Sequence, residues 1–229
     1  MIGIIDYGMG NLGSVSNAFD FLEIESRIIT RSDELGDCRA VILPGVGAFG
    51  DCMEHLSKHG FVESVKAWIA GGRPFLGICL GLQVLYEGSD ESPGTKGLGL
   101  FKGWARRFPE GGLKVPQIGW NCVEQVNKDC PLFGGLDDQT YFYFVHSYYV
   151  DPEGDAADSG RTEYGISYTS AIWSGNVMAV QFHPEKSQAR GLSMLRNFVE
   201  WSERYERDDC DTGDRPQGRS VRTASPGPI

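Results

Sequence analysis

The chain has 229 residues, of which 41% are hydrophobic and 23% charged, so it can build a core and is not disordered as a whole. Its 31 acidic and 21 basic residues give a net charge of -10, which repels phosphates and argues against nucleic-acid binding. No apolar run approaches the ~18 residues of a membrane span and no signal peptide opens the chain, so we expect a cytoplasmic protein without membrane contact.

Apolar runs and helical periodicity alternate through the first 87 residues. The pattern predicts strands at 1–7, 26–30, 40–43 and 74–78, separated by helices at 12–22, 49–70 and 80–87. This alternation with short glycine-rich joints predicts an α/β fold, with a mostly parallel central sheet flanked by helices. In such a fold the chemistry lies at the carboxyl ends of the strands.

The second half of the chain follows a different pattern. Short segments at 122–126, 141–150 and 165–168 are separated by Gly, Pro and Asp turns and predict a smaller antiparallel portion. A strand is expected at 177–182 and a closing amphipathic helix at 190–205. Residues 206–229 contain few large apolar side chains, so we expect a domain over 1–203 and a disordered tail over 204–229.

The 31 glycines are about twice the usual ~7%, and three clusters of them follow predicted strands. The first cluster spells GxGxxG over residues 8–13 between a strand and a helix, which is the context of a dinucleotide site. No acidic residue ends the next strand, where Arg31 stands instead. We therefore prefer a tight turn to an NAD(P) site and predict no cofactor, while an NADP-binding oxidoreductase stays the alternative.

The second cluster, GICLG over residues 77–81, has the pattern of a nucleophile elbow with Cys79 at its tip. Glycines flank such a nucleophile because side chains there would collide with the neighbouring strand and helix. The start of a helix also lowers a thiol pKa and favours the reactive thiolate. The alternative is a buried structural cysteine, which is our interpretation of most of the other cysteines.

A base for that thiol is expected from one of four histidines. His183 directly follows a predicted strand, and Glu185 two residues later can fix its tautomer and stabilise the imidazolium. His146 also follows an apolar run, but no carboxylate accompanies it. His55 and His59 lie four residues apart on a predicted helix without a third ligand, so we interpret them as solvated surface and predict no metal site.

The third cluster is Pro44-Gly45-Val46-Gly47 at the end of the strand expected beside the elbow strand. Its free backbone N–H groups, together with that of Leu80, would then point at one spot near Cys79. We interpret this segment as an oxyanion hole, with an ordinary turn as the alternative.

These motifs resemble the class I, or triad, glutamine amidotransferases, which have a flavodoxin-like fold, through GICLG and the downstream FHPE at 182–185. Within that superfamily five blocks are similar to the glutaminase subunits of imidazole glycerol phosphate synthase: DYGMGNLGSV (6–15), PGVGAFG (44–50), GWN (119–121), YFVHSYY (143–149) and QFHPEKS (181–187). The resemblance implies that glutamine is hydrolysed and that its ammonia passes to a (β/α)8-barrel cyclase subunit of histidine biosynthesis in a heterodimer. A stand-alone γ-glutamyl hydrolase or cysteine peptidase, and a catalytically dead interaction module, are the alternatives.

The resemblance also implies roles for individual residues. Cys79 is the implied nucleophile, His183 the acid and base, and Glu185 its orienting partner. The implied oxyanion donors are Val46 and Leu80, the implied glutamine-binding residues are Gly45, Gly47, Gln83, Glu91, Ser147 and Tyr148, and the implied cyclase-facing residues are Trp120, Asn121, Tyr143 and Lys186. One departure is Gln117, where the family often has histidine, and we assign this difference to the interface.

Overall fold

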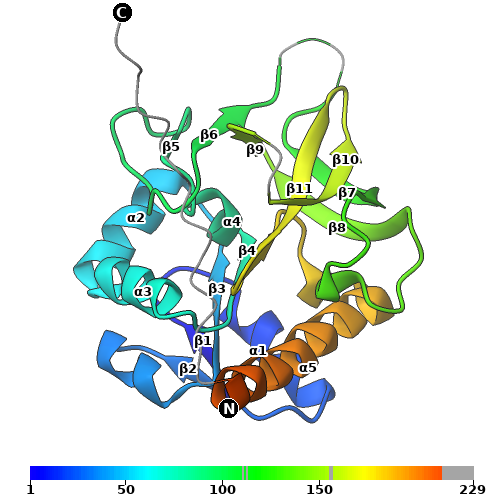
Figure 1. Ribbon diagram of the computed structural model, residues 1–229. Helices are drawn as coiled ribbons and strands as arrows, with labels where there is room; N and C mark the ends of the chain where they lie inside the picture. The colour runs from blue at the N-terminus through cyan, green and yellow to red at the C-terminus, as the bar shows by residue number, and fades with distance from the viewer. Residues whose placement is uncertain (110, 112, 155–156, 213–229) are drawn as a thin grey trace, which may run out of the picture.

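The computed structural model describes residues 1–109, 111, 113–154 and 157–212, and its described strands form one mixed sheet (Figure 1). Five strands at one end are parallel, in the order β2-β1-β3-β4-β12. Their bounds are β1 (Ile2–Ile5), β2 (Ser26–Ile29), β3 (Ala40–Gly45), β4 (Phe75–Cys79) and β12 (Val177–Val180). The α/β class with a mostly parallel part is confirmed.

The antiparallel portion continues the same sheet from β12 through β11, β10, β7 and β8. Its strands are β5 (Gly88–Ser89), β6 (Gly103–Arg107), β7 (Gln117–Gln125), β8 (Thr140–His146), β9 (Tyr148–Pro152), β10 (Asp158–Glu163) and β11 (Ser167–Ser174). The segment expected at 141–150 breaks at Ser147, because β8 pairs with β7 whereas β9 pairs with β6 and β11. That break forms a corner beside the end of β4.

Helices cover both faces of the parallel strands (Figure 1). On one face α1 (Leu12–Phe21) and α5 (Gln188–Thr212) pack on the buried Ile2, Ile4 and Ile42; on the other, α2 (Phe49–Lys58) and α3 (Phe61–Ala70) pack on Ile5, Val41 and Leu43. Alternate residues of each strand therefore serve two cores, which is why these strands appear in the sequence as continuous apolar runs. The remaining helical turns are η1 (Ser32–Asp37), α4 (Leu80–Gln83), η2 (Pro131–Phe133) and η3 (Pro184–Lys186).

Three of the predicted helices have bounds that differ from the prediction. The helix predicted at 49–70 is two helices, because Gly60 adopts φ +73 between them. The helix predicted at 80–87 stops at Gln83, since the loop at 97–101 donates its backbone N–H groups to carbonyls at 84–87. The closing helix continues past its expected end to Thr212, so it covers the first part of the predicted tail. Residues 213–229 lie outside the described residues, and the disordered tail stays a prediction there.

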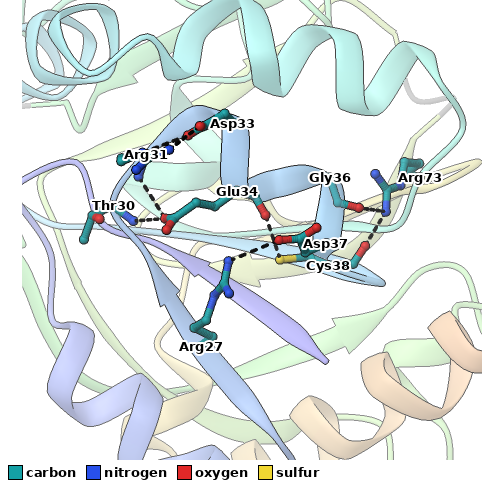
Figure 2. A network of polar contacts seen from close by, with 9 residues as sticks. All are labelled: Arg27, Thr30, Arg31, Asp33, Glu34, Gly36, Asp37, Cys38 and Arg73. Atoms are coloured by element: carbon teal, nitrogen blue, oxygen red, sulfur yellow. Dashed lines mark hydrogen bonds and ion pairs between the residues drawn. The ribbon is translucent and has the colours of Figure 1, made fainter.

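The connection from β2 to β3 is held by a polar network on the surface (Figure 2). Glu34 accepts hydrogen bonds from the backbone N–H of Thr30 and of Arg31, both at 3.2 Å. Arg73, which precedes β4, donates to the backbone carbonyls of Gly36 and Cys38. Exposed ion pairs contribute little energy, but these backbone contacts fix how β3 enters the sheet beside β4.

Among the described residues, no helix combines the length and apolarity needed to cross a bilayer.

Candidate active site

Cys79 stands at the junction of β4 and α4 with φ +56, a conformation rare for residues other than glycine. A Cβ on Gly81 would lie 2.0 Å from the Leu43 carbonyl oxygen, and one on Gly77 would lie 2.6 Å from the Gly81 oxygen. Any side chain at these two positions would push strand and helix apart, so the two glycines let the turn close. The local geometry is that of a nucleophile elbow, as the sequence predicts.

Two strand ends meet the elbow because both neighbours of β4 are parallel to it. Gly45 at the end of β3 pairs with Cys79, and Val180 at the end of β12 pairs with Ile78. The residues that follow β3 and β12 therefore emerge on both sides of the Cys79 sulfur. This register places the Pro44–Gly47 segment beside the elbow, as expected, and brings residues 181–185 to the other side.

His183 is paired with Glu185 at the end of that second strand. Its Nδ1 lies 2.8 Å from Glu185 Oε1, and the two side chains are 4% and 1% exposed. Burial alone would lower the pKa of His183, but the charge and hydrogen bonding of Cys79, and then of Glu185, raise that pKa to about 10. The helix that follows Cys79, α4, is a single turn, so only a small helix dipole acts at this position.

A cavity of about 290 Å³ opens beside the Cys79 sulfur. The expected residues that line it are Val46, Gly47, Cys79, Leu80, Gln83, Glu91, Ser147, Tyr148, His183 and Lys186. Three further lining residues, Pro116, Val145 and His146, were not expected there. Gly45 is not part of the lining, since a Cβ on it would point at Leu80 Cβ, 2.7 Å away. The cavity has the size of a small-molecule binding site, and polar side chains line part of it.

Two of the lining side chains are already engaged with the protein. Glu91 Oε2 accepts the backbone N–H of Phe49 at 2.7 Å, which supports the first turn of α2. Gln83 donates both hydrogens of its Nε2, to the Tyr148 carbonyl at 2.9 Å and to Gln181 Oε1 at 3.1 Å. A ligand can therefore reach Gln83 only through its Oε1 atom.

The site thus combines an elbow thiol, a buried histidine–glutamate pair and a cavity beside the sulfur. Residues 4–201 match the family model described as glutamine amidotransferase class-I. The chain belongs to the class I glutamine amidotransferases. The resemblance predicted from the motifs is therefore confirmed, and the chain is an enzyme of the glutamine amidotransferase type.

Curated relatives and solved structures agree with this amidotransferase assignment. A protein of Methanocaldococcus jannaschii named imidazole glycerol phosphate synthase subunit HisH is 49% identical over 87% of this chain and 99% of its own length. A protein of the same name from Syntrophotalea carbinolica is 47% identical over 86% of this chain and 98% of its own. The solved structure of PurLQS from Thermotoga maritima shares the fold, with a TM-score of 0.71 at 18% identity over 87% of this chain and 97% of that one.

The amidotransferase exposes an apolar face on the β7–β8 pair. Three of the four residues expected to face a cyclase lie on these two strands, and their side chains differ in exposure and in contacts. Trp120 is 47% exposed and packs edge-on against Tyr143, with ring centroids 6.0 Å apart. Tyr141 and Ile118 extend this face and are 58% and 57% exposed. Asn121 instead donates its Nδ2 to the Glu163 carbonyl at 2.8 Å, so its side chain is used within the domain.

Lys186, the fourth of these residues, is exposed and lines the cavity. Gln117 was expected at the interface but is 3% exposed, and its Oε1 accepts a hydrogen bond from Tyr168 at 2.9 Å. The side chain of Gln117 therefore lies inside the domain. The reason is the strand alternation, which turns Gln117 inward and Ile118 outward on β7.

Two histidines also differ from expectation. His146 lines the cavity and is buried, with Nδ1 2.8 Å from the Tyr148 carbonyl oxygen; burial lowers its pKa to about 4, so it is neutral. The sequence signal that could have identified His146 as a cavity residue is its position directly after an apolar run. His55 is half-buried rather than solvated, because its Nδ1 contacts the Tyr7 carbonyl at 3.0 Å, whereas His59 is exposed. The Gly8–Gly13 segment is a tight turn in which Gly8 and Gly10 adopt positive φ.

Proposed function

We propose that this chain hydrolyses glutamine to glutamate and ammonia through Cys79, His183 and Glu185. The observation that carries the proposal is the elbow cysteine beside a buried histidine–carboxylate pair on the next parallel strand end. A nucleophile, a base and an orienting carboxylate in that order are the requirements for covalent acyl transfer. The family supplies glutamine as the acyl donor.

In the proposed mechanism the Cys79 thiolate attacks the side-chain amide carbon of glutamine. The His183 imidazolium protonates the departing nitrogen, ammonia leaves, and a glutamyl thioester remains on the sulfur. The neutral imidazole then takes a proton from water as the water oxygen attacks the thioester carbon. Collapse of the intermediate expels the Cys79 thiolate beside the restored His183 imidazolium, and the new carboxyl group of glutamate loses its proton to solvent. Glu185 keeps the Nδ1 proton in place throughout.

We propose the backbone N–H groups of Val46 and Leu80 as the oxyanion donors. Leu80 opens α4, so its N–H has no partner within the helix, and both residues line the cavity at Cys79. One such donor is worth ~10²-fold or more in rate. A Val46 peptide turned away from the sulfur would therefore leave the chain slow on its own.

We propose a (β/α)8-barrel cyclase as the partner that receives the ammonia, in imidazole glycerol phosphate synthase of the histidine pathway. The name of the curated relatives supports this assignment, since they are subunits of that synthase. The exposed apolar side chains around Trp120 suit the core of a protein interface. A reactive thiol and a biosynthetic role both suit the reducing cytoplasm.

The test measures glutamate and ammonia release by the chain alone and with the barrel subunit and its ligand. We expect weak activity alone, strong stimulation in the complex, and loss of activity in Cys79→Ala. Selective labelling of Cys79 by a glutamine-like diazo-ketone is the expected companion result. Equal rates with and without the partner would overturn the proposed stimulation, and activity in Cys79→Ala would overturn the proposed triad.

A further inference from the structure

Gln181 contacts the sulfur of Cys79, although nothing in the proposed mechanism uses it. Its side chain is fully buried, and its Nε2 lies 3.6 Å from Cys79 Sγ. The cause is the strand register: Val180 pairs with Ile78, so the next residue of each strand lies side by side. Gln181 is held there by its own backbone N–H, which donates to the Ser170 carbonyl at 2.8 Å.

The orientation of the Gln181 carboxamide is fixed by a second glutamine. Gln83 Nε2 donates to the Tyr148 carbonyl, which can only accept, so the amino end of Gln83 faces both of its partners. The Gln181 atom that receives the other Gln83 hydrogen must therefore be the oxygen. This leaves the Gln181 amino group, a pure donor, directed at the sulfur.

A backbone carbonyl oxygen that also contacts the sulfur makes a donor at the sulfur necessary for a stable thiolate. Cys79 Sγ lies 3.9 Å from the Val145 carbonyl oxygen, which accepts the proton of the neutral thiol but repels a thiolate. Cys79 is 6% exposed, so water offers the thiolate little compensation. A buried N–H donor that points at the sulfur stabilises the charged form at the point where it is made.

His183 and the phenols of Tyr7 and Tyr168 interact electrostatically with Cys79. Burial raises the pKa of both phenols, so they stay neutral at pH 7. Of these three groups His183 alone can carry a positive charge, and it must give up a proton during each turnover. A neutral donor on the sulfur acts in both states of that histidine.

We propose that Gln181 is a catalytic residue whose amino group stabilises the Cys79 thiolate, and that Gln83 is the positioning residue that keeps that amino group facing the sulfur. The proposal rests on the proposed nucleophilic role of Cys79. It gives Gln83 a function that does not require bound glutamine.

The test is the pH dependence of alkylation of the thiol by iodoacetamide in the full chain, followed by mass spectrometry of the peptide that carries Cys79. In Gln181→Met the side chain keeps its length but cannot donate, and we expect the pH midpoint to rise by about one unit. In Gln181→Glu a carboxylate replaces the donor, and the midpoint should rise further. Gln83→Met frees the Gln181 amide to turn and should raise the midpoint in part.

Gln125→Met is the matched control, because Gln125 also donates side-chain hydrogen bonds, to the Leu136 and Asp137 carbonyls, but does not contact Cys79. Its midpoint should equal that of the wild type even if its melting temperature falls. Midpoints unchanged in both Gln181 variants, whatever their stability, would overturn the proposal and leave Gln181 a packing residue. Alkylation needs no glutamine, so this outcome is distinct from a failure of the glutaminase assay in Cys79→Ala.

Discussion

Substitution of Gly45 tests whether close packing at the end of β3 holds the nucleophile elbow in its active geometry. The glycine ends β3 and pairs with Cys79, but it does not line the cavity. In Gly45→Ala the new Cβ would lie 2.7 Å from Leu80 Cβ and 2.9 Å from the Gly81 nitrogen. Both contacts belong to the elbow itself, so the strain falls on the turn that carries the nucleophile.

The required movement can be estimated from these contacts. Ordinary van der Waals contact begins at 3.4 Å, so Leu80 and the end of β3 must separate by about 0.7 Å. Overpacking of this kind costs about 1–3 kcal/mol of unfolding free energy. Misplacement of reacting groups by ~1 Å can cost about 10²-fold in rate. We therefore expect kcat/KM for glutamine to fall about 10- to 100-fold while the chain still folds.

The assay is steady-state glutamate release by the complex with the barrel subunit, combined with urea unfolding of the chain. Gly13→Ala is the matched control, because a Cβ at Gly13 meets nothing within 4 Å and lies inside α1. It should leave kcat/KM unchanged and raise the unfolding free energy by up to ~0.5 kcal/mol. A Gly45→Ala variant with kcat/KM within about twofold of the wild type would refute the reasoning.

Three further outcomes are expected. Glu185→Gln keeps the shape but removes a charge that raises the pKa of His183, so kcat/KM should fall ~10²-fold and its pH profile should change; an unaltered profile contradicts the pairing. The pKa of His183 is about 10 in the fold against an ordinary 6.5, so its stabilisation is complete below pH 6.5 and is lost as pH rises through 10. Because Cys79 is the largest cause that raises this pKa, Cys79→Ala should move that loss to lower pH in urea unfolding, and superimposable curves would count against the sulfur–imidazole coupling. Trp120→Ala should change the unfolding free energy by less than ~0.5 kcal/mol yet weaken barrel binding at least ~10-fold in calorimetry; unchanged affinity would remove Trp120 from the interface.

The parts of the site that depend on local sequence could be predicted. The elbow at Cys79 follows from glycines that must lie within two residues of the nucleophile, and the His183–Glu185 pair follows from a two-residue spacing. The alternation of apolar runs and helical periodicity was likewise sufficient for the parallel half of the sheet.

Other parts of the site, which depend on register between distant strands or on the phase of a strand, were not predicted. Gln181 and Cys79 are brought together only by the pairing of β12 with β4, and no motif announces that pairing. Gln117 was assigned to the interface because its inward direction depends on the phase of β7 relative to the core. The division of the helix at 49–70 depends on Gly60 adopting a left-handed conformation, which glycine permits but does not require.

The antiparallel portion is better regarded as a wall of the site than as an addition to the parallel sheet. The corner between β8 and β9 supplies the Val145 carbonyl that faces the sulfur and the Tyr148 carbonyl that orients Gln83. The same strand β8 presents Tyr143 to the exposed apolar face. A partner bound on that face would press on residues only two positions from the carbonyl at Cys79. The proposed stimulation by a cyclase therefore needs no long pathway through the domain, because one β-strand borders both the partner surface and the nucleophile.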